Sequence, residues 1–262
     1  MEALRGLPVF RRICGFVRRS DIPSEATFSR AFKEFAKIGL GEKVHQALVA
    51  QWVTPELVGH ICRDATAIEG REKPRAKPEP PKPETRVERQ GRQSAPEALA
   101  ELPVHCDVGT KKNSKDYKAT WIGFKLHADV TDCGLPISLA LTAASLHDRQ
   151  AAIPLMQLTS ARLDYLYDVM DAAYDAQPVY AVSRSLGHVP IIDRNGRGRE
   201  VIPLAPHEAA RYKERRVAER FNSRLKEEFG GGNVMVMGSP ESRAAPDVWR
   251  DRPVRRPVAQ AD

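Results

Sequence analysis

The sequence predicts a mixed α/β fold, and three observations lead to that prediction. Residues 123–142 alternate apolar and polar side chains on both sides of an Asp-Cys-Gly turn, which is typical of a β-hairpin. Two further strand-like runs, 57–69 and 163–170, lie before and after this hairpin, and helical stretches follow the hairpin and the second run. The composition, 42% hydrophobic and 29% charged, suits a packed core. This order of elements does not fit a β-sandwich or a helix bundle.

A small helical module precedes the strands, over residues 1–55. Residues 24–38 and 42–52 carry apolar side chains at helical spacing, with Pro23 placed for helix entry and Gly39 for the helix end. The first helix places three aromatic side chains on one face: Phe28, Phe32 and Phe35. Packing against the main domain explains this module most simply, and DNA binding or dimerisation is the functional alternative.

The main domain, predicted over residues 56–238, contains a proline- and charge-rich insertion at 71–100. Five prolines lie in its first part, residues 71–95: Pro74, Pro78, Pro80, Pro81 and Pro83. Because proline lacks an amide hydrogen and fixes φ, residues 71–95 are predicted to be an extended linker without helix or central strand. The chain has a formal net charge of +7, and residues 1–40 and 71–95 hold the excess. A solvated linker is the simpler interpretation, and contact with DNA phosphates is the other.

The remaining elements follow in order along the chain. The first hairpin strand alternates two sets of side chains: Phe124, Leu126, Ala128 and Val130 against Lys125, His127 and Asp129. Asp148, after His147, is placed to cap the next helix. Downstream we predict four elements: a strand at 163–170, a helix to Leu186, a short strand at 188–193 and a long helix at 206–229.

The long helix carries a polar stripe. Steps of three and four residues place five side chains on one face: Tyr212, Arg215, Glu219, Asn222 and Lys226. Val217, Phe221 and Leu225 lie on roughly the opposite side. From periodicity alone we favour a solvated charged face. The alternative is metal-assisted phosphoryl chemistry. Such chemistry needs carboxylates from separate elements that converge on divalent ions, and a packed helix could supply one of them.

The spacing within this stripe is more specific than its periodicity. Tyr, two residues, Arg, three residues, Glu, six residues and Lys resembles the signature of DDE transposases from bacterial insertion sequences, and here it reads YKERRVAERFNSRLK. The segment DVMDAAYDA resembles the part of that family that carries the second acid, with Asp171 and Tyr174 three residues apart. RDATAI resembles the motif on the family's first strand, with Asp64 as the first acid. The resemblance runs from about residue 57 to 238.

The resemblance implies an RNase H-like fold, in which a mixed sheet with flanking helices carries the metal-binding triad Asp64, Asp171 and Glu219. Such enzymes are endonucleases that use Mg²⁺ or Mn²⁺ to cut double-stranded DNA at transposon ends. They then join the freed 3′ hydroxyl to target DNA, and they act as multimers, so a homodimer is expected. Tyr212 and Arg215 would hold DNA near the site, as would Lys226. A decayed transposase that still binds DNA and an RNase H-like nuclease that does not transpose remain the alternatives.

Several neighbouring residues compete for these roles. Asp107 also follows a short apolar segment and is the alternative first acid, whereas Asp168 and Asp175 flank the second. A basic block with two interleaved aromatic residues could follow a phosphate backbone: Lys111, Lys112, Lys115, Tyr117, Lys118, Trp121 and Lys125. A solvated loop is an equally good interpretation of that block.

The C-terminal residues 239–262 change character, with four prolines and no helical periodicity. We interpret them as an irregular, disordered tail, created by a frameshift that replaced a closing helix and puts activity in doubt. Synonymous codons for residues 245–260, read one nucleotide later, give an apolar helical sequence. The nucleotide sequence of the gene tests this hypothesis, which stop codons in that frame would exclude.

The cysteines and the N-terminal region point to a cytoplasmic protein. Four cysteines form no CxxC pair, so we expect reduced thiols; His105-Cys106 lacks further ligands to complete a metal site. No apolar run approaches the roughly 18 residues of a membrane span. Residues 1–20 lack the small-residue cleavage site of a signal peptide.

Overall fold

The computed structural model describes residues 1–52, 57–74, 83–112, 117–194, 196 and 202–234. The predicted tail and its frameshift therefore lie outside the described residues. The chain divides into two compact units, Met1–Thr54 and Pro55–Asp262.

The N-terminal unit is helical. It contains α1 (Glu2–Gly6), α2 (Pro8–Ile13), α3 (Glu25–Lys37) and α4 (Leu40–Trp52). Ser24 caps α3, because its hydroxyl accepts a hydrogen bond from the backbone N–H of Thr27 at 3.3 Å. The two helices expected at 24–38 and 42–52 are confirmed as α3 and α4.

The second unit is built on one mixed sheet. Its seven strands among the described residues are β1 (Val58–Gly70), β2 (Asp107–Lys112), β3 (Lys118–Thr131), β4 (Pro136–Ala143), β5 (Tyr165–Met170), β6 (Val189–Ile192) and β7 (Asn233–Val234). The order is β2-β3-β1-β5-β6, with β4 on β3 and β7 on β1. β3 is antiparallel to β1, β2 and β4, whereas β5 is parallel to β1 and β6. The predicted mixed α/β class with an RNase H-like sheet is confirmed.

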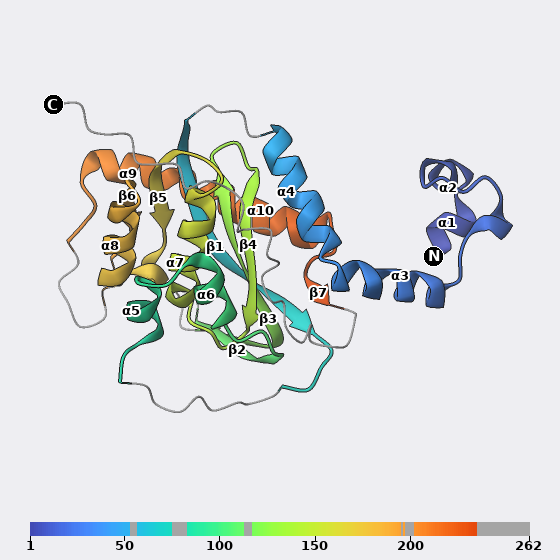
Figure 1. Ribbon diagram of the computed structural model, residues 1–262, viewed down its shortest axis with the longest axis horizontal. Helices are drawn as coiled ribbons and strands as arrows, with labels where there is room; N and C mark the ends of the chain where they lie inside the picture. The colour runs from blue at the N-terminus through green and yellow to red at the C-terminus, as the bar shows by residue number, and fades with distance from the viewer. Residues whose placement is uncertain (53–56, 75–82, 113–116, 195, 197–201, 235–262) are drawn as a thin grey trace. The chain divides into compact units, whose positions relative to one another are not determined.

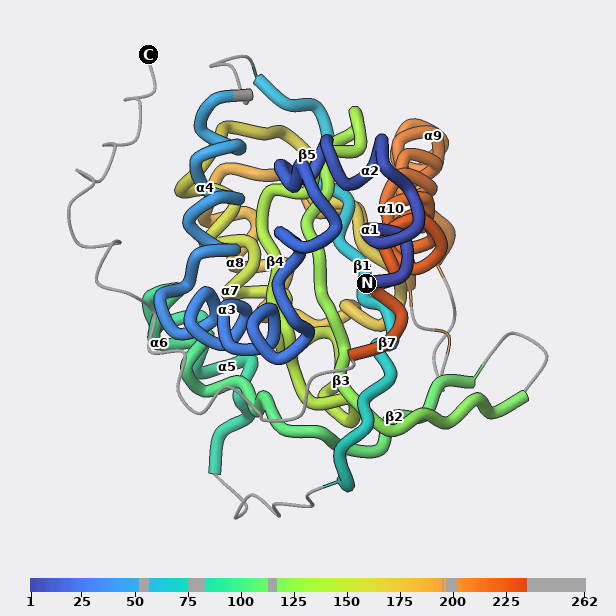
Figure 2. Tube along the Cα trace, turned by 90° about the vertical axis from the view of Figure 1, so that its right-hand side faces the viewer, coloured from blue at the N-terminus to red at the C-terminus, as the bar shows by residue number. Residues whose placement is uncertain are grey.

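Helices cover both faces of this sheet (Figures 1 and 2). On one face lie α5 (Arg86–Gln90), α6 (Ala95–Ala100), α7 (Arg149–Ser160) and α8 (Gln177–Ser185). On the other face lie α9 (Pro206–Tyr212) and α10 (Arg216–Glu227). The turned view of Figure 2 separates the two helical layers, with α7 and α8 on one side of the strands and α9 and α10 on the other.

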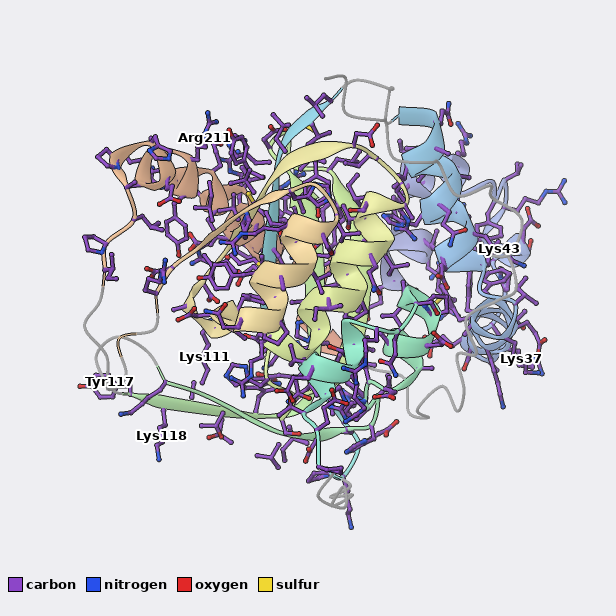
Figure 3. All side chains as sticks on the ribbon, turned by 60° about the vertical axis from the view of Figure 1, so that its left-hand side comes forward. Lys37, Lys43, Lys111, Tyr117, Lys118 and Arg211 are labelled. Carbon is purple, nitrogen blue, oxygen red and sulfur yellow. The ribbon has the colours of Figure 1, made fainter. Side chains whose placement is uncertain are left out.

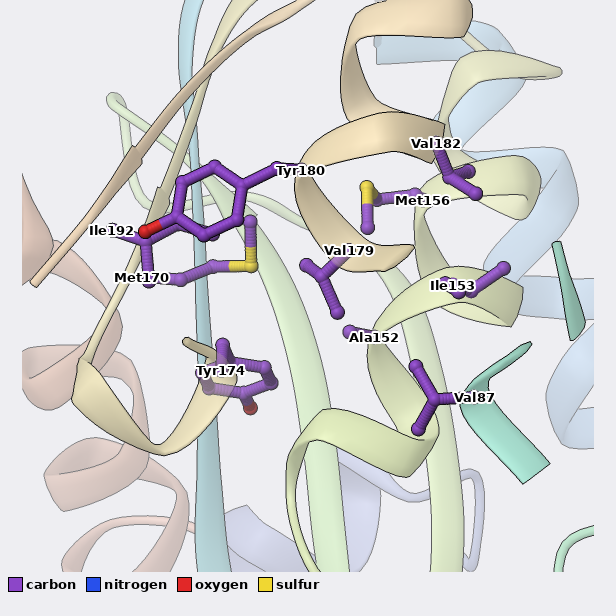
Figure 4. Close-up of a cluster of buried hydrophobic side chains, with 10 residues drawn as sticks. All are labelled: Val87, Ala152, Ile153, Met156, Met170, Tyr174, Val179, Tyr180, Val182 and Ile192. Atoms are coloured by element: carbon purple, nitrogen blue, oxygen red, sulfur yellow. The ribbon is translucent and has the colours of Figure 1, made fainter. Parts of the chain in front are cut away.

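The larger apolar core lies under α7 and α8. Met170 of β5 belongs to one buried cluster with Ile153 and Met156 of α7, Val179 of α8 and Val87 of α5 (Figure 4). A burial of this kind is worth roughly 1.5–3 kcal/mol for each large side chain, so this layer holds the helices on the sheet.

The alternation expected along β3 does not separate buried from solvated residues. Lys125 is half-buried, and His127 and Asp129 are fully buried, because α7 covers the face on which they lie. His127 Nε2 lies 2.9 Å from the hydroxyl oxygen of Thr142, and Asp129 accepts hydrogen bonds from Arg63 and Thr159. A sheet covered on both faces buries both sets of side chains.

The prediction that residues 71–95 contain no helix is wrong. Thr85 caps α5 and forms a capping box with Glu88, and Ser94 pairs in the same way with Glu97 at the start of α6. Pro96 lies in the first turn of α6, where proline is tolerated. Residues 75–82 lie outside the described residues.

The predictions about membrane spans and cysteines can be compared with the structure. No helix within the described ranges is long and apolar enough to cross a membrane. All four cysteines are free thiols.

Candidate active site

Two carboxylates, Asp64 and Asp171, lie at neighbouring positions at the ends of paired parallel strands. The register between β1 and β5 ends with the pair Arg63 and Met170, so Asp64 and Asp171 are the next residues of the two strands. Cys62, two positions before Asp64, packs towards α10. Because side chains alternate along a strand, Asp64 lies on the α10 face as well. The sheet thus brings together the first two acids that the sequence predicts.

Asp171 begins the turn that follows β5. Its carboxylate accepts a hydrogen bond from the backbone N–H of Ala173 at 2.9 Å. Tyr174 ends this 3-10 turn (Ala172–Tyr174) and is fully buried, and its hydroxyl has no hydrogen-bond partner among the described residues. The tyrosine therefore fixes the turn through packing, which places Asp171 at the end of the strand.

The third group of side chains comes from the junction of α9 and α10. The single helix predicted over 206–229 is interrupted by a 3-10 turn, Lys213–Arg215. Apolar side chains seat α10 on the sheet, since Val217 and Phe221 pack against Ala128 and Val130 of β3. The polar stripe beside them is thereby brought over β1.

The polar stripe contacts the acids. Asn222 Nδ2 donates a hydrogen bond to Asp64 Oδ2 at 3.0 Å. Arg215 Nη1 lies 3.5 Å from Asp64 Oδ1, and Arg215 Nη2 donates to Glu219 Oε1 at 2.6 Å. The prediction of a solvated stripe is therefore wrong for Arg215 and Asn222, whereas the Glu219 side chain is 54% exposed. Periodicity identified the stripe but not the surface that it lies against.

Burial and repulsion shape the charges of this cluster. Burial raises the pKa of Asp64 to about 6, and the negative charge of Asp171 adds to the rise while Arg215 opposes it. Burial also raises the pKa of Asp171. For Arg215, burial disfavours the charged form, but attraction to Asp64, Asp171 and Glu219 outweighs it and raises the pKa. The two aspartates thus form a poorly solvated pair that positive charge stabilises.

A projecting ribbon carries positive charge beside the acids. β2 and the outer part of β3 form a two-stranded ribbon, in which Lys112 pairs with Lys118 and Asp107 pairs with Gly123. This ribbon extends beyond the body of the unit (Figure 2). The charge of Lys111 lowers the pKa of both Asp64 and Asp171. Lys118 and Tyr117 lie at the ribbon end (Figure 3). Lys115 lies outside the described residues.

Comparison with known proteins assigns the family. A family model described as a transposase DDE domain matches residues 59–239, which include the whole sheet from the second residue of β1 onward. The chain belongs to this family. Neither the curated proteins nor the solved structures gave a match.

The residues of this DDE transposase domain fit a divalent cation in part. Among the described residues, no three His, Cys, Asp or Glu side chains are already grouped as a ligand set. Asp64 and Asp171 are nevertheless paired carboxylates whose burial a cation would offset, and oxygen ligands suit Mg²⁺. Asn222 Oδ1 is a buried acceptor with no partner in the described part of the chain, beside Asp64. The donor set therefore suits a hard cation, although Glu219 is held by Arg215.

Not every basic residue predicted to touch DNA is accessible. Lys125 is 15% exposed, and its ammonium contacts the Asp148 carboxylate and the Leu146 carbonyl, each at 2.7 Å. Trp121 donates to the Phe124 carbonyl at 3.0 Å, which holds it against the ribbon. Lys111 and Lys112 are exposed, on opposite faces of β2. The Lys125 ammonium is therefore paired within the domain, unlike the exposed side chains of Lys111 and Lys112.

Two residues of the signature lie at the ends of the helical stripe. Tyr212 is half-buried near Cys62 and Ala218, and burial raises its pKa to about 12. Lys226 lies on the last turn of α10, close to Gly232. These two side chains flank Arg215 and Glu219 along the helices.

The competing acids are placed elsewhere. Asp107 of β2 pairs with Gly123 of β3, and Gly123 pairs with Glu69 of β1. Glu69 lies five positions along β1 from Asp64. The Asp107 carboxylate accepts a hydrogen bond from the Ser145 hydroxyl. Asp168 is buried on the opposite face, where Arg63 contacts it at 3.3 Å. Asp175 accepts from the Tyr180 hydroxyl at 3.2 Å. None of the three joins the Asp64 and Asp171 pair.

Two residues that act on the acids, Asn222 and Asp148, were given no part in the site from the sequence. Asn222 lies three positions after Glu219 on the stripe, and that spacing was the available signal. Asp148 was interpreted as a helix cap; it occupies the cap position of α7, but its side chain makes no capping hydrogen bond and pairs with Lys125 instead. Its negative charge raises the pKa of Asp171.

Proposed function

We propose that this DDE transposase domain catalyses metal-dependent DNA strand cleavage and strand transfer at the ends of an insertion sequence. The observation that carries the proposal is the placement of Asp64 on β1 beside Asp171, which directly follows β5, with Arg215 and Asn222 of the polar stripe in contact with Asp64. Asp64 is the first acid in this proposal and Asp107 is not, because Asp107 lies farther along the sheet.

Asp64, Asp171 and Glu219 would hold Mg²⁺ or Mn²⁺. When bound, the cations would activate the attacking oxygen and stabilise charge on the leaving oxygen. Asn222 keeps the Asp64 carboxylate oriented through its hydrogen bond. Glu219, exposed on α10, is the carboxylate with most freedom to turn towards the aspartates. The protein thus supplies two fixed acids and one adjustable acid.

The DNA would lie across the α10 face of the sheet. Arg215, Tyr212 and Lys226 follow the helical signature, and Lys111 with Lys112 lies on the ribbon beside it. Lysine and arginine at phosphates supply most of the affinity and its salt dependence. A two-stranded ribbon with exposed basic residues is suited to following a phosphate backbone.

The organisation of the chain follows from this proposal. Residues 56–238 form the catalytic domain, and residues 1–55 form a module for DNA binding or for dimerisation. Double-stranded DNA is the partner, at the terminal repeats and at the target. A homodimer that holds two ends is the assembly that fits such a reaction.

Cleavage of labelled DNA that carries the flanking inverted repeats tests the proposal. We expect cleavage and strand joining by the full chain with Mg²⁺, and loss of both in Glu219→Gln. Glu227→Gln, an exposed charge change on the same helix, is the matched control and keeps activity.

Three other outcomes would refute parts of the proposal. Specific DNA binding without cleavage identifies a decayed transposase. Cleavage without strand joining identifies a nuclease that does not transpose. Cleavage that survives in Glu219→Gln removes this residue from the catalytic set.

A further inference from the structure

Arg215 lies among the three predicted acids. Its guanidinium contacts Glu219 at 2.6 Å and Asp64 at 3.5 Å, and the charge of Asp171 acts on it as well. The Arg215 side chain is half-buried at the end of the turn between α9 and α10. One cation of this chain therefore attracts carboxylates from β1, from the turn after β5 and from α10, and it offsets only part of their negative charge.

We propose that Arg215 is an internal counter-ion of this carboxylate cluster, and that a divalent cation must displace it to bind. The inference rests on the proposed function, because it concerns the same metal site. It assigns to Arg215 a regulatory role that precedes any contact with DNA.

The contacts at Asp64 indicate that the Arg215 guanidinium and a divalent metal ion compete for the same carboxylate. Asn222 donates to Oδ2, and the Arg215 guanidinium faces Oδ1, so both oxygens are engaged. A cation that coordinates Oδ1 of Asp64 would bind on the side of the carboxylate that the guanidinium faces at 3.5 Å. Glu219 reaches the aspartates only after it leaves Arg215. A guanidinium and a divalent cation at the same carboxylates would also repel each other strongly.

Displacement by movement is the available route. Arginine keeps its charge at any pH at which the protein is folded, so the guanidinium cannot leave by losing a proton. It ends a short 3-10 turn, and such turns between helices are frequent sites of adjustment. A long side chain at that point moves without unfolding α10, which Val217 and Ala218 hold on the sheet.

Titration of the full chain with Mn²⁺, followed by the electron paramagnetic resonance signal of the free ion, tests the inference. Three proteins are compared: wild type, Arg215→Gln and Arg216→Gln. Arg216 is the next residue, is exposed, and loses the same charge. We expect Arg215→Gln to bind Mn²⁺ about three- to tenfold more tightly than wild type, as loss of a partly exposed competing ion pair allows. Arg216→Gln is expected to match wild type.

Equal or weaker binding by Arg215→Gln overturns the inference and leaves the proposed function in place. An equal gain in Arg216→Gln also overturns it, because the effect would then be general charge removal. No binding by any of the three overturns both the inference and the metal-dependent function.

A variant that fails to fold does not end the test. Arg215→Lys keeps the charge but loses the planar fork of the guanidinium. If circular dichroism finds Arg215→Gln unfolded, Arg215→Lys should bind Mn²⁺ more tightly than wild type by about twofold. Binding no tighter than wild type refutes the displacement.

Discussion

Replacement of Arg63 by methionine should destabilise the sheet more than any change on its surface. Arg63 is fully buried, and its guanidinium contacts Asp129 at 2.6 Å and Asp168 at 3.3 Å, both of which are fully buried as well. The residue links β1 to β3 on one side and to β5 on the other. Removal of one partner from a buried ion pair costs about 3–5 kcal/mol, because it leaves an uncompensated charge.

Hydroxyl groups around the two carboxylates narrow the expected loss in the free energy of unfolding. Asp168 would keep two donors, Tyr165 at 3.0 Å and Ser183 at 2.6 Å. Asp129 would keep only Thr159, at 2.7 Å, and one of its oxygens already lacks a partner among the described residues. We therefore expect Arg63→Met to lower the free energy of unfolding by about 3–4 kcal/mol, mostly through Asp129.

Urea unfolding followed by tryptophan fluorescence measures this loss. Arg216→Met, at an exposed position, should stay within about 0.5 kcal/mol of wild type. The double variant Arg63→Met with Asp129→Asn should recover at least about 1 kcal/mol of the loss, because the stranded charge is gone. A loss below about 1 kcal/mol in the single variant, or strict additivity in the double variant, would refute the reasoning.

The pH dependence gives a second check of the same prediction. Burial raises the pKa of Asp129, which Arg63 now opposes. Without Arg63 the pKa rises further, so the folded state binds the proton more tightly than the unfolded state does. The deficit of Arg63→Met is then largest above that raised pKa and shrinks as the pH falls. The same deficit at about pH 5 and about pH 8 would contradict the account.

Three further predictions concern Asp64 and the lysines. Because burial raises the pKa of Asp64 to about 6, the metal-free protein should lose stability as the pH rises from about 4 through 6. Asp64→Asn should remove that loss and gain about 3 kcal/mol at neutral pH in thermal melts, because a pKa raised by about two units costs about 1.4 kcal/mol per unit. The variant should also abolish cleavage, and a steeper pH dependence of its stability would be evidence against the prediction. Removal of Lys111, Lys112 and Lys118 should reduce the salt slope of DNA binding by about 3, measured by fluorescence anisotropy. Lys125→Met should leave that slope unchanged and lower stability, because Lys125 pairs with Asp148; the opposite pattern would return Lys125 to the DNA surface.

Local patterns were sufficient to predict most of the elements that carry the site. The turn at Asp132-Cys133-Gly134 and its flanking alternation predicted β3 and β4, and the apolar run before Asp171 predicted β5. These are properties of neighbouring residues, so a single sequence contains them. The family resemblance then ordered the acids, which spacing alone does not do.

Other features depended on contacts between distant residues. Arg63 is separated from Asp168 by 105 positions, and no local pattern indicates that a strand arginine is buried between two carboxylates. In the insertion, the prolines led to the prediction that no helix forms. Two capping boxes in the same sequence indicated the opposite, at Thr85 with Glu88 and at Ser94 with Glu97. A cap predicts where a helix begins, and Val87 and Ala98 then supply the buried contacts that keep it.

The alternation of β1 separates two kinds of charge cluster. Arg63 points to the α7 face, where hydroxyl donors from Thr159, Tyr165 and Ser183 share the two carboxylates with it. Asp64, the next residue, points to the α10 face, where one arginine faces three acids. The first cluster is nearly satisfied within the protein. The second keeps an excess of negative charge beside an exposed glutamate, and that excess is what a divalent cation would balance.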